Sequence, residues 1–269
     1  MGNKGRILVA VLLVVFLGGL AWEVLLPHEP VYQGRPLSAW LHDLDTSIKE
    51  RLPIEQVRVL MAEKQKKREV AETAIRHIGT NALPTLITML RSKDSKPREK
   101  LFVWSTKQPI SQLHLQGASE RRWRANEGFK VLGEKAEPAI PTLIEMLKDR
   151  DEVEVPITMD ALGAIGPKAF LPLINALTSQ DYRVRIGALF ALEEFAPQVP
   201  PAMVVPALVG SLTDTNARAR SLAVFTLGKY GTAANAAIPG LLKTLNDPNA
   251  HVRLDAAMAL KQIDPEATP

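Results

Sequence analysis

The chain has 269 residues, enough for one or two globular domains, and no cysteine, which excludes disulfides, thiolate metal ligands and a cysteine nucleophile. Its net charge of +4 is uneven, since residues 27–110 carry 15 Lys and Arg against 10 Asp and Glu. Residues 151–269 carry 9 against 12, so the positive excess belongs to the N-terminal half.

The N-terminus has the pattern of a membrane helix. Lys4 and Arg6 precede an apolar run over residues 7–26 that is interrupted only by Glu23. As a helix this run would span about 30 Å, roughly one hydrocarbon core. We predict a signal-anchor that stays in the membrane. The alternative is a signal peptide cleaved after Ala21, where small residues occupy the expected places.

The flanking charges predict the topology. Lys4 and Arg6 favour a cytoplasmic N-terminus, so the rest of the chain is expected outside the cytoplasm. The chain is then a single-pass protein of the cell membrane with an extracytoplasmic (periplasmic) portion, or a secreted protein if the segment is cleaved. Residues 1–27 form the signal-anchor or signal peptide, and residues 28–67 a membrane-proximal linker with N-terminal capping helices.

An apolar segment with proline in second place recurs along the chain. Its copies occupy residues 83–90, 140–147, 171–177, 205–212 and 238–245. Proline fits the first turn of a helix, and the following apolar pair and Leu form one buried stripe. The final Leu residues of the last four copies are 30, 35 and 33 residues apart, which is the period of a helical hairpin.

A second helix precedes each of these segments and ends at a glycine. Apolar runs end at Gly79, at Gly166 and near Gly231, and the last of these runs includes Phe225 in its pattern. Glycine just after the last apolar residue commonly ends a helix. The sequence therefore predicts an alternation of glycine-terminated and proline-started helices.

A polar pair joins one hairpin to the next. The same spacing of six residues occurs in Asp214–Arg220, in Asp247–Arg253 and, with serine in place of aspartate, in Ser179–Arg185. We expect each aspartate to cap the following helix. Each arginine, on the first turn of that helix, can reach an aspartate of a neighbouring repeat.

The helix-start proline, turn aspartate and helix arginine resemble HEAT repeats, particularly the short bacterial type related to phycobilisome-lyase repeats. Residues 247–260 are the fullest copy, and the resemblance covers residues 68–263 apart from an interruption. Residues 32–41 also resemble the stretch that precedes such repeats in many exported bacterial HEAT proteins. The resemblance implies an all-α fold, an α-solenoid of stacked helical hairpins preceded by the transmembrane helix.

The solenoid is expected over residues 68–265, because a single hairpin cannot bury its apolar stripe alone. We expect residues 33–269 to be almost wholly helical, with no strand. A non-repeat insertion at about 92–118 accounts for the 57 residues between Leu90 and Leu147. Together with Trp123 it is either an added helical segment that packs its aromatic side chains on the stack or a partner-binding insertion.

The sequence offers no short motif for chemistry. Its histidines are His28, His42, His77, His114 and His251, and no two lie three or four residues apart, so no helical metal pair forms. The chain also lacks a nucleophile elbow, a phosphate loop and a dinucleotide-binding glycine pattern. We therefore predict no catalytic, cofactor-binding or metal-binding residues, no cofactor, and a protein that is not an enzyme.

These observations favour a non-catalytic, membrane-tethered HEAT-repeat scaffold that mediates protein–protein interaction outside the cytoplasm. Its partner would be a protein or peptide of unknown identity, with the membrane contacted through residues 7–26. The alternative, a lyase or hydroxylase-like enzyme of the HEAT type, would need paired histidines and carboxylates. Nucleic-acid binding is not expected, because the repeats after residue 150 are net acidic.

Overall fold

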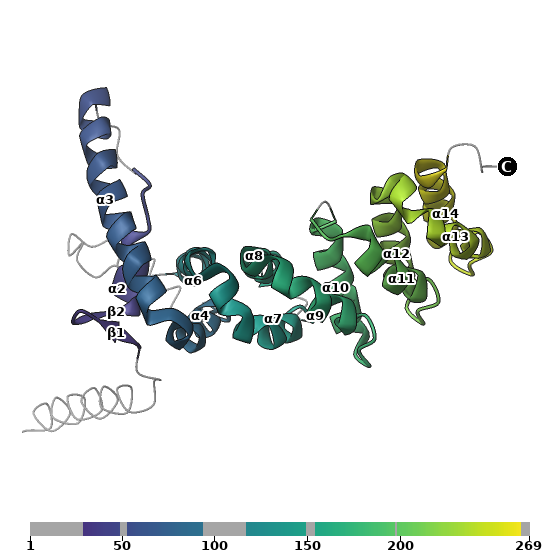
Figure 1. Ribbon diagram of the computed structural model, residues 1–269, viewed down its shortest axis with the longest axis horizontal. Coiled ribbons are helices and arrows are strands. Elements are labelled where there is room, and N and C mark those ends of the chain that lie inside the picture. Colours follow the sequence, from purple (N-terminus) through teal and green to yellow (C-terminus); the bar gives the residue numbers. More distant parts are fainter. Residues whose placement is uncertain (1–28, 49–52, 94–116, 149–153, 197, 265–269) are drawn as a thin grey trace, which may run out of the picture. The chain divides into compact units, whose positions relative to one another are not determined.

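The computed structural model describes residues 29–48, 53–93, 117–148, 154–196 and 198–264 of the chain. These ranges are mainly helical and divide into two compact units, residues 1–85 and 86–269 (Figure 1). The predicted membrane helix at 7–26 and most of the insertion at 92–118 lie outside the described residues.

The described part of unit 1 contains a small β-hairpin, so the expectation of no strand in residues 33–269 is wrong. Strands β1 (Val31–Tyr32) and β2 (Arg35–Pro36) pair antiparallel. Gln33 and Gly34 form the turn with φ of +49° and +73°, the positive values that two-residue hairpin turns require. Helical periodicity gave no warning of this turn, because it spans only two residues.

The hairpin packs on helix α2 (Leu37–Asp43) through polar contacts. The Trp40 indole donates to the carbonyl of Tyr32 at 3.3 Å, and the Arg35 guanidinium lies 3.9 Å from the Trp40 ring centroid. Arg35 also pairs with Asp43 at 2.8 Å. The segment that precedes the repeats therefore has a defined structure of its own.

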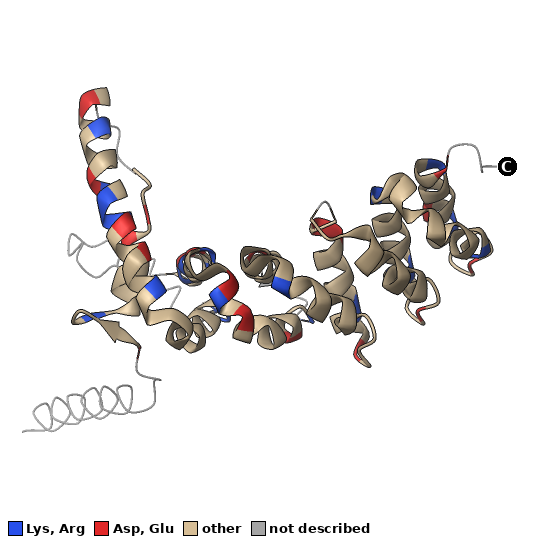
Figure 2. Cartoon of the chain, viewed as in Figure 1, with Lys and Arg blue, Asp and Glu red and all other residues tan. Residues whose placement is uncertain are grey.

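Helix α3 (Ile54–Ile78) runs unbroken across residues 67 and 68. Its C-terminal half buries an apolar stripe, whereas its N-terminal half is exposed and carries interspersed charges (Figure 2). In the basic run 64–68, Lys67 pairs with Glu63 in solvent, and Arg68 donates to the carbonyl of Leu44 at 2.9 Å. Most of this run is a solvated helix face.

The remaining elements follow the predicted alternation. After η1 (Gly79–Ala82) and α4 (Leu83–Leu90), the helices are α6 (Ala118–Leu132), η2 (Gly133–Ala139), α7 (Ile140–Met146), α8 (Glu154–Ile165), η3 (Gly166–Ala169), α9 (Phe170–Ala176), α10 (Tyr182–Glu194), α11 (Pro201–Ser211), α12 (Ala217–Lys229), η4 (Gly231–Ala237), α13 (Ile238–Thr244) and α14 (Ala250–Ile263). In unit 2, α6 packs on α8, and α12 packs between α10 and α14.

The glycines at helix ends adopt the predicted conformation. Gly79, Gly133, Gly166 and Gly231 have φ between +51° and +78° and each begins a short 3₁₀ turn. Glycine reaches this region without the penalty that a Cβ imposes, so the chain can turn directly into the next proline-started helix.

Helix α11 departs from the predicted start. It begins at Pro201, so Pro206 lies inside the helix and not in its first turn. The connection from α10 also has no glycine; it runs from Phe195 to Pro200. The three prolines at 197, 200 and 201 set this connection apart from the other turns.

Among the described residues, the stretch Pro156–Ala176 has the length and apolar composition of a membrane-spanning helix. The structure shows that this stretch is not one continuous helix. Gly166 divides it into α8, η3 and α9. Leu162 and Leu173 on these helices are fully buried in the stack. The stretch is therefore solenoid core.

Candidate interaction surface

The predicted Asp–Arg pairs connect successive hairpins. Arg185 of α10 holds Asp214 with Nε and Nη2 at 2.6 and 2.8 Å from the two carboxylate oxygens. Arg220 of α12 holds Asp247 in the same way at 2.7 and 2.8 Å. Each arginine uses Nη1 for a carbonyl of its own loop, which ties two loops together. The prediction that each arginine reaches an aspartate of the neighbouring repeat is confirmed.

The predicted role of aspartate as helix cap is wrong. Asn216 and Asn249 cap α12 and α14 by accepting from backbone N–H groups at 2.9 and 3.4 Å. Asp214 and Asp247 instead accept from the N–H groups of these two asparagines at 2.8 Å. The carboxylates are thus fixed inside the loop, where they face the arginine of the preceding hairpin.

The contacts with arginine favour the ionised carboxylates of Asp214 and Asp247. The hydrogen bonds from Arg185 and Arg220 are the main cause that lowers the pKa values of Asp214 and Asp247, against the opposing effect of burial. Side chains of the second pair are only 13% and 6% exposed. We call the two linked pairs, Arg185–Asp214 and Arg220–Asp247, the ladder. The ladder is a partly desolvated element that connects α10, α12 and α14.

On these three helices, two rows of side chains occupy a common exposed face. The first row is Arg183, Arg218 and His251, and the second, seven residues later on each helix, is Phe190, Phe225 and Met258. Residues seven apart lie on one side of a helix. We call this surface the α10–α12–α14 face.

The second row is apolar and open to solvent. Phe190 is half-buried, Phe225 is 49% exposed and Met258 is 54% exposed. The Arg218 guanidinium lies 5.2 Å from the Phe190 ring centroid and links neighbouring helices. Phe225 fitted the buried pattern in the sequence, so its exposure corrects that assignment.

A pocket lies beside this face, between α8 and α10. Gly187 of α10 packs closely against Leu147, since a Cβ added at Gly187 would lie 2.5 Å from the Leu147 Cβ. The ring of Phe195 lies 3.0 Å from where a Cβ at Gly163 would stand, and it lines the pocket with Met159. Asp160 and Glu194 add two carboxylates to the lining.

A second pocket shares Glu194 and lies at the ends of α10 and α12. Lys229 pairs there with Glu193 at 2.8 Å, and the Tyr230 hydroxyl donates to the carbonyl of Val199 at 3.2 Å. Burial raises the pKa of Tyr230 to about 12, so this hydroxyl stays protonated. Glu194 therefore lines both pockets, whereas Glu193 is paired with Lys229.

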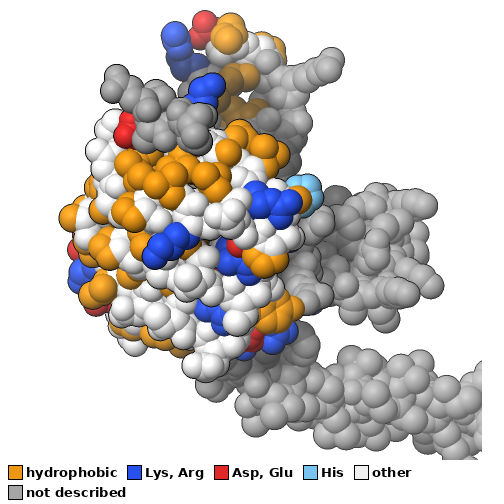
Figure 3. Space-filling view, turned by 90° about the vertical axis from the view of Figure 1, so that its right-hand side faces the viewer, with side chains coloured by type: hydrophobic (Ala, Val, Ile, Leu, Met, Phe, Trp, Pro, Cys, Tyr) orange, Lys and Arg blue, Asp and Glu red, His pale blue; other side chains and the backbone are white. Residues whose placement is uncertain are grey.

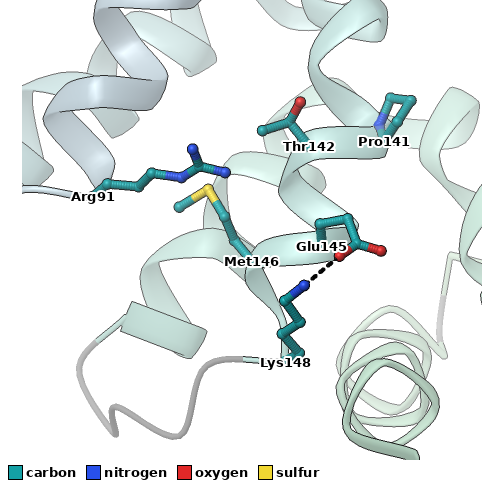
Figure 4. Close-up of a pocket in the computed structure, with 6 residues that line it drawn as sticks. All are labelled: Arg91, Pro141, Thr142, Glu145, Met146 and Lys148. Atoms are coloured by element: carbon teal, nitrogen blue, oxygen red, sulfur yellow. Dashed lines mark hydrogen bonds and ion pairs between the residues drawn. The ribbon is translucent and has the colours of Figure 1, made fainter. Parts of the chain in front are cut away.

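A third pocket has a different composition and lies on α7 (Figure 4). Glu145 and Lys148 line it and pair at 2.6 Å, with Arg91 and Met146 near them. Its single carboxylate is therefore already neutralised. The pocket offers cationic and apolar contacts but no pair of groups suited to acid–base chemistry.

The described histidines do not converge. His42 lies on α2, His77 stacks on Tyr32 with ring centroids 5.1 Å apart, and His251 lies on α14. His28 and His114 are outside the described residues. Within the described ranges, no group of three or more His, Asp or Glu side chains could hold a metal ion. The predicted absence of metal and cofactor remains a prediction.

The sequence did not reveal the pockets. Two sequence features could have indicated the pockets next to α10. One is the absence of a glycine between α10 and α11, and the other is the small Gly163, against which Phe195 packs. At the edge of the insertion, α6 begins at Ala118 and leaves Trp123 exposed, so this aromatic does not pack into the stack.

A family model described as HEAT repeats matches residues 170–261. The bilin biosynthesis protein MpeU of Synechococcus sp. (strain WH8020) is 30% identical over 130 residues, which cover 48% of this chain and 43% of that relative. The chain thus spans less than half the length of the curated relative it matches.

Solved structures of low identity also resemble the chain. A designed armadillo repeat protein in complex with the peptide (KR)4 has 17% identity and a TM-score of 0.40, over 85% of this chain and 99% of its own. Human deoxyhypusine hydroxylase in complex with glycerol has 16% identity and a TM-score of 0.36, over 86% and 96%. Because both TM-scores are below 0.5, neither likeness bears on what this chain does.

The prediction that the chain is not an enzyme is wrong, because its 130-residue match is to a biosynthesis protein. The prediction relied on short motifs and histidine spacing, and a site assembled from distant residues has neither. Residues 170–261, which run from α9 into α14, match the HEAT-repeat family, and the resemblance read from the sequence is thereby confirmed.

Proposed function

We propose that this chain is a HEAT-repeat scaffold that binds a protein or peptide partner through the α10–α12–α14 face. The observation that carries the proposal is the exposed apolar row, in which Phe190, Phe225 and Met258 take the same place on three successive helices. Stacking of the repeats does not need these side chains to be large, since they point away from the buried stripe.

The physical properties of the face support this function. Aromatic and Met side chains are enriched at protein interfaces, where they lose the most water on binding. The ladder through Arg185 and Arg220 holds the row in place before a partner arrives, which lowers the entropic cost of binding. The face therefore combines exposed apolar contacts with a rigid support.

The charges beside the row favour an extended partner with both signs of charge. Arg218, in the neighbouring polar row, lies over the Phe190 ring, while Asp160 and Glu194 line the pocket between α8 and α10. Opposite charges on a partner would fix its direction along the helices, because like charges would meet in the reversed orientation.

We also propose that the scaffold acts at a membrane surface outside the cytoplasm, tethered by residues 7–26. The apolar run and the charges of Lys4 and Arg6 support this placement. A periplasm-active reporter fused to Pro269 should be active, and a fusion active only in the cytoplasm would contradict the topology.

The binding function is tested by affinity capture with three versions of the full-length chain. We expect the wild type and Leu171→Ser to recover a common partner that Phe225→Ser/Met258→Ser does not recover. Leu171 is a matched control, because it is 55% exposed on α9, outside the row. Circular dichroism checks that each variant keeps its helices. Equal recovery by all three versions would refute the proposed face.

A second candidate function is a step in bilin biosynthesis, and the 130-residue match to MpeU supports it. If the chain handles a bilin, adding that pigment to the purified protein should shift and intensify its visible absorbance. A spectrum equal to the sum of free bilin and protein would remove this candidate.

A further inference from the structure

The outward side of α14 differs from the equivalent sides of α10 and α12. On α10 and α12 this side carries Leu189 and Val224, which are buried by the next hairpin. Ala257 holds that position on α14 and is exposed, and Leu254, one turn earlier, is 59% exposed. Figure 3 looks onto this end of unit 2, where hydrophobic side chains gather beside Lys and Arg.

Arg253, the counterpart of Arg185 and Arg220 on α14, binds no carboxylate among the described residues. Arg253 donates through Nη1 to the carbonyl of Asp247 at 2.7 Å, as Arg220 does to Asp214. In Arg185 and Arg220, Nε and Nη2 bind a carboxylate, but among the described residues no acceptor is found for these two atoms of Arg253. A guanidinium fork matches a carboxylate in shape and charge.

A second cation lies two turns further on. Lys261 occupies the place on α14 that Glu193 occupies on α10, where Glu193 pairs with Lys229 of the covering helix. The charge at this place is therefore reversed on α14, and a covering helix would have to bring a carboxylate.

An apolar outer face on a solenoid helix is exposed to water unless another element covers it. Among the described residues, Leu254 and Ala257 on α14, with the partly exposed Leu242 on α13, form such an uncovered face. We call the set Leu242, Arg253, Leu254, Ala257 and Lys261 the end face.

We propose that the end face docks an acidic amphipathic helix of a partner protein, with one carboxylate bound by Arg253 and a second by Lys261. The apolar side of that helix covers Leu254 and Ala257. The chain supplies the template itself, because α12 covers α10 in this way with Asp214 in the fork of Arg185. This site is separate from the α10–α12–α14 face and does not depend on the function proposed for it.

The template also supplies a probe. A synthetic peptide of residues 201–231 contains the sequence of the α11–α12 hairpin, with Asp214 for Arg253 and, through Lys229→Glu, a second carboxylate for Lys261. Because a single hairpin cannot bury its apolar stripe alone, we expect the peptide to fold as it docks. The control peptide adds Asp214→Asn and changes only the ladder carboxylate. Because the chain has no cysteine, Ala257→Cys in the full-length protein gives a single thiol at the centre of the end face.

The measurement is the rate of maleimide labelling at this thiol. We expect the probe peptide to slow labelling about tenfold at saturation, since a covered thiol reacts only when the complex opens. The control peptide, or Arg253→Gln in the chain, should abolish most of this protection. A thiol placed by Leu171→Cys on α9 should label at the same rate with and without the probe.

Three results would overturn the inference. The first is unchanged labelling of Ala257→Cys with the probe, and the second is equal protection by the control peptide. The third is protection that rises with the concentration of the chain alone and disappears with Leu254→Glu, which would assign the end face to a second copy. Sedimentation of the chain without peptide distinguishes this last case.

Discussion

Replacing Arg220 by alanine should destabilise the repeat stack strongly. The change removes two charge-assisted bonds to Asp247, of 2.7 and 2.8 Å, and one bond to the carbonyl of Asp214. It also leaves the Asp247 carboxylate, 6% exposed, without its counter-ion. Breaking a buried pair from one side costs about 3–5 kcal/mol, so we expect a loss of roughly 3 kcal/mol because this pair keeps some access to water.

The assay is urea unfolding of the full-length chain in mild detergent, followed by circular dichroism. Arg183→Ala is the matched control, because Arg183 on α10 also pairs with an aspartate, Asp181, at 2.7 Å, but its side chain is 46% exposed. An exposed pair contributes about 0–1 kcal/mol. The double variant Arg220→Ala/Asp247→Ala should lose less than the sum of the single losses. If Arg220→Ala cost no more than Arg183→Ala, the ladder would not be what fixes the helices.

Three further predictions concern the buried leucines, the pH dependence of stability and the metal content. Leu208→Ala and Leu241→Ala, both at fully buried sites, should each cost about 2–5 kcal/mol in urea melts; a loss under about 0.5 kcal/mol would show that the stripe is not the core. Since the pKa values of Asp214 and Asp247 are lowered, their stabilisation is present above the unfolded pKa of roughly 4 and is lost as the pH falls through the folded values. Melts at decreasing pH should show this loss, and Arg220→Ala should reduce it. Elemental analysis of untagged, dialysed protein should find no stoichiometric iron or zinc, and one equivalent of either would contradict that prediction.

Local rules made much of the fold predictable. Proline in a first turn and glycine after the last apolar residue are short-range signals, and outside the α10–α11 connection they kept their meaning in the structure. The aspartate and arginine six residues apart also marked the residues that pair between neighbouring repeats. The cap assignment failed because two side chains compete for one helix start. Asn216 and Asn249 take the cap, and the aspartates are drawn to the arginines.

The candidate surfaces were less predictable, because the spacing of apolar residues along the sequence does not show which side chains are exposed to solvent. Phe225 stands at helical spacing within an apolar run, and only the position of the neighbouring helices shows that it faces water. The pocket between α8 and α10 needs Phe195 and Gly163, which are 32 residues apart in the sequence and lie side by side only in the folded chain. The small hairpin turn at Gln33 was missed for the opposite reason, since it is too short to produce a period.

The exclusion of catalysis failed because an absent motif is weak evidence. Histidine spacing tests only metal pairs within one helix, whereas repeat proteins bring together residues from several hairpins. The chain matches a protein named for bilin biosynthesis over 130 residues at 30% identity.

Photo-crosslinking in intact cells tests the central claim, partner binding on the α10–α12–α14 face, most directly. A photoreactive amino acid replaces Phe225 in one version of the full-length chain and Leu171 in the other, two positions of similar exposure on different helix rows. The account predicts one defined protein adduct from position 225 and none of that mass from position 171. The same adduct from both positions, or from position 171 alone, would contradict it.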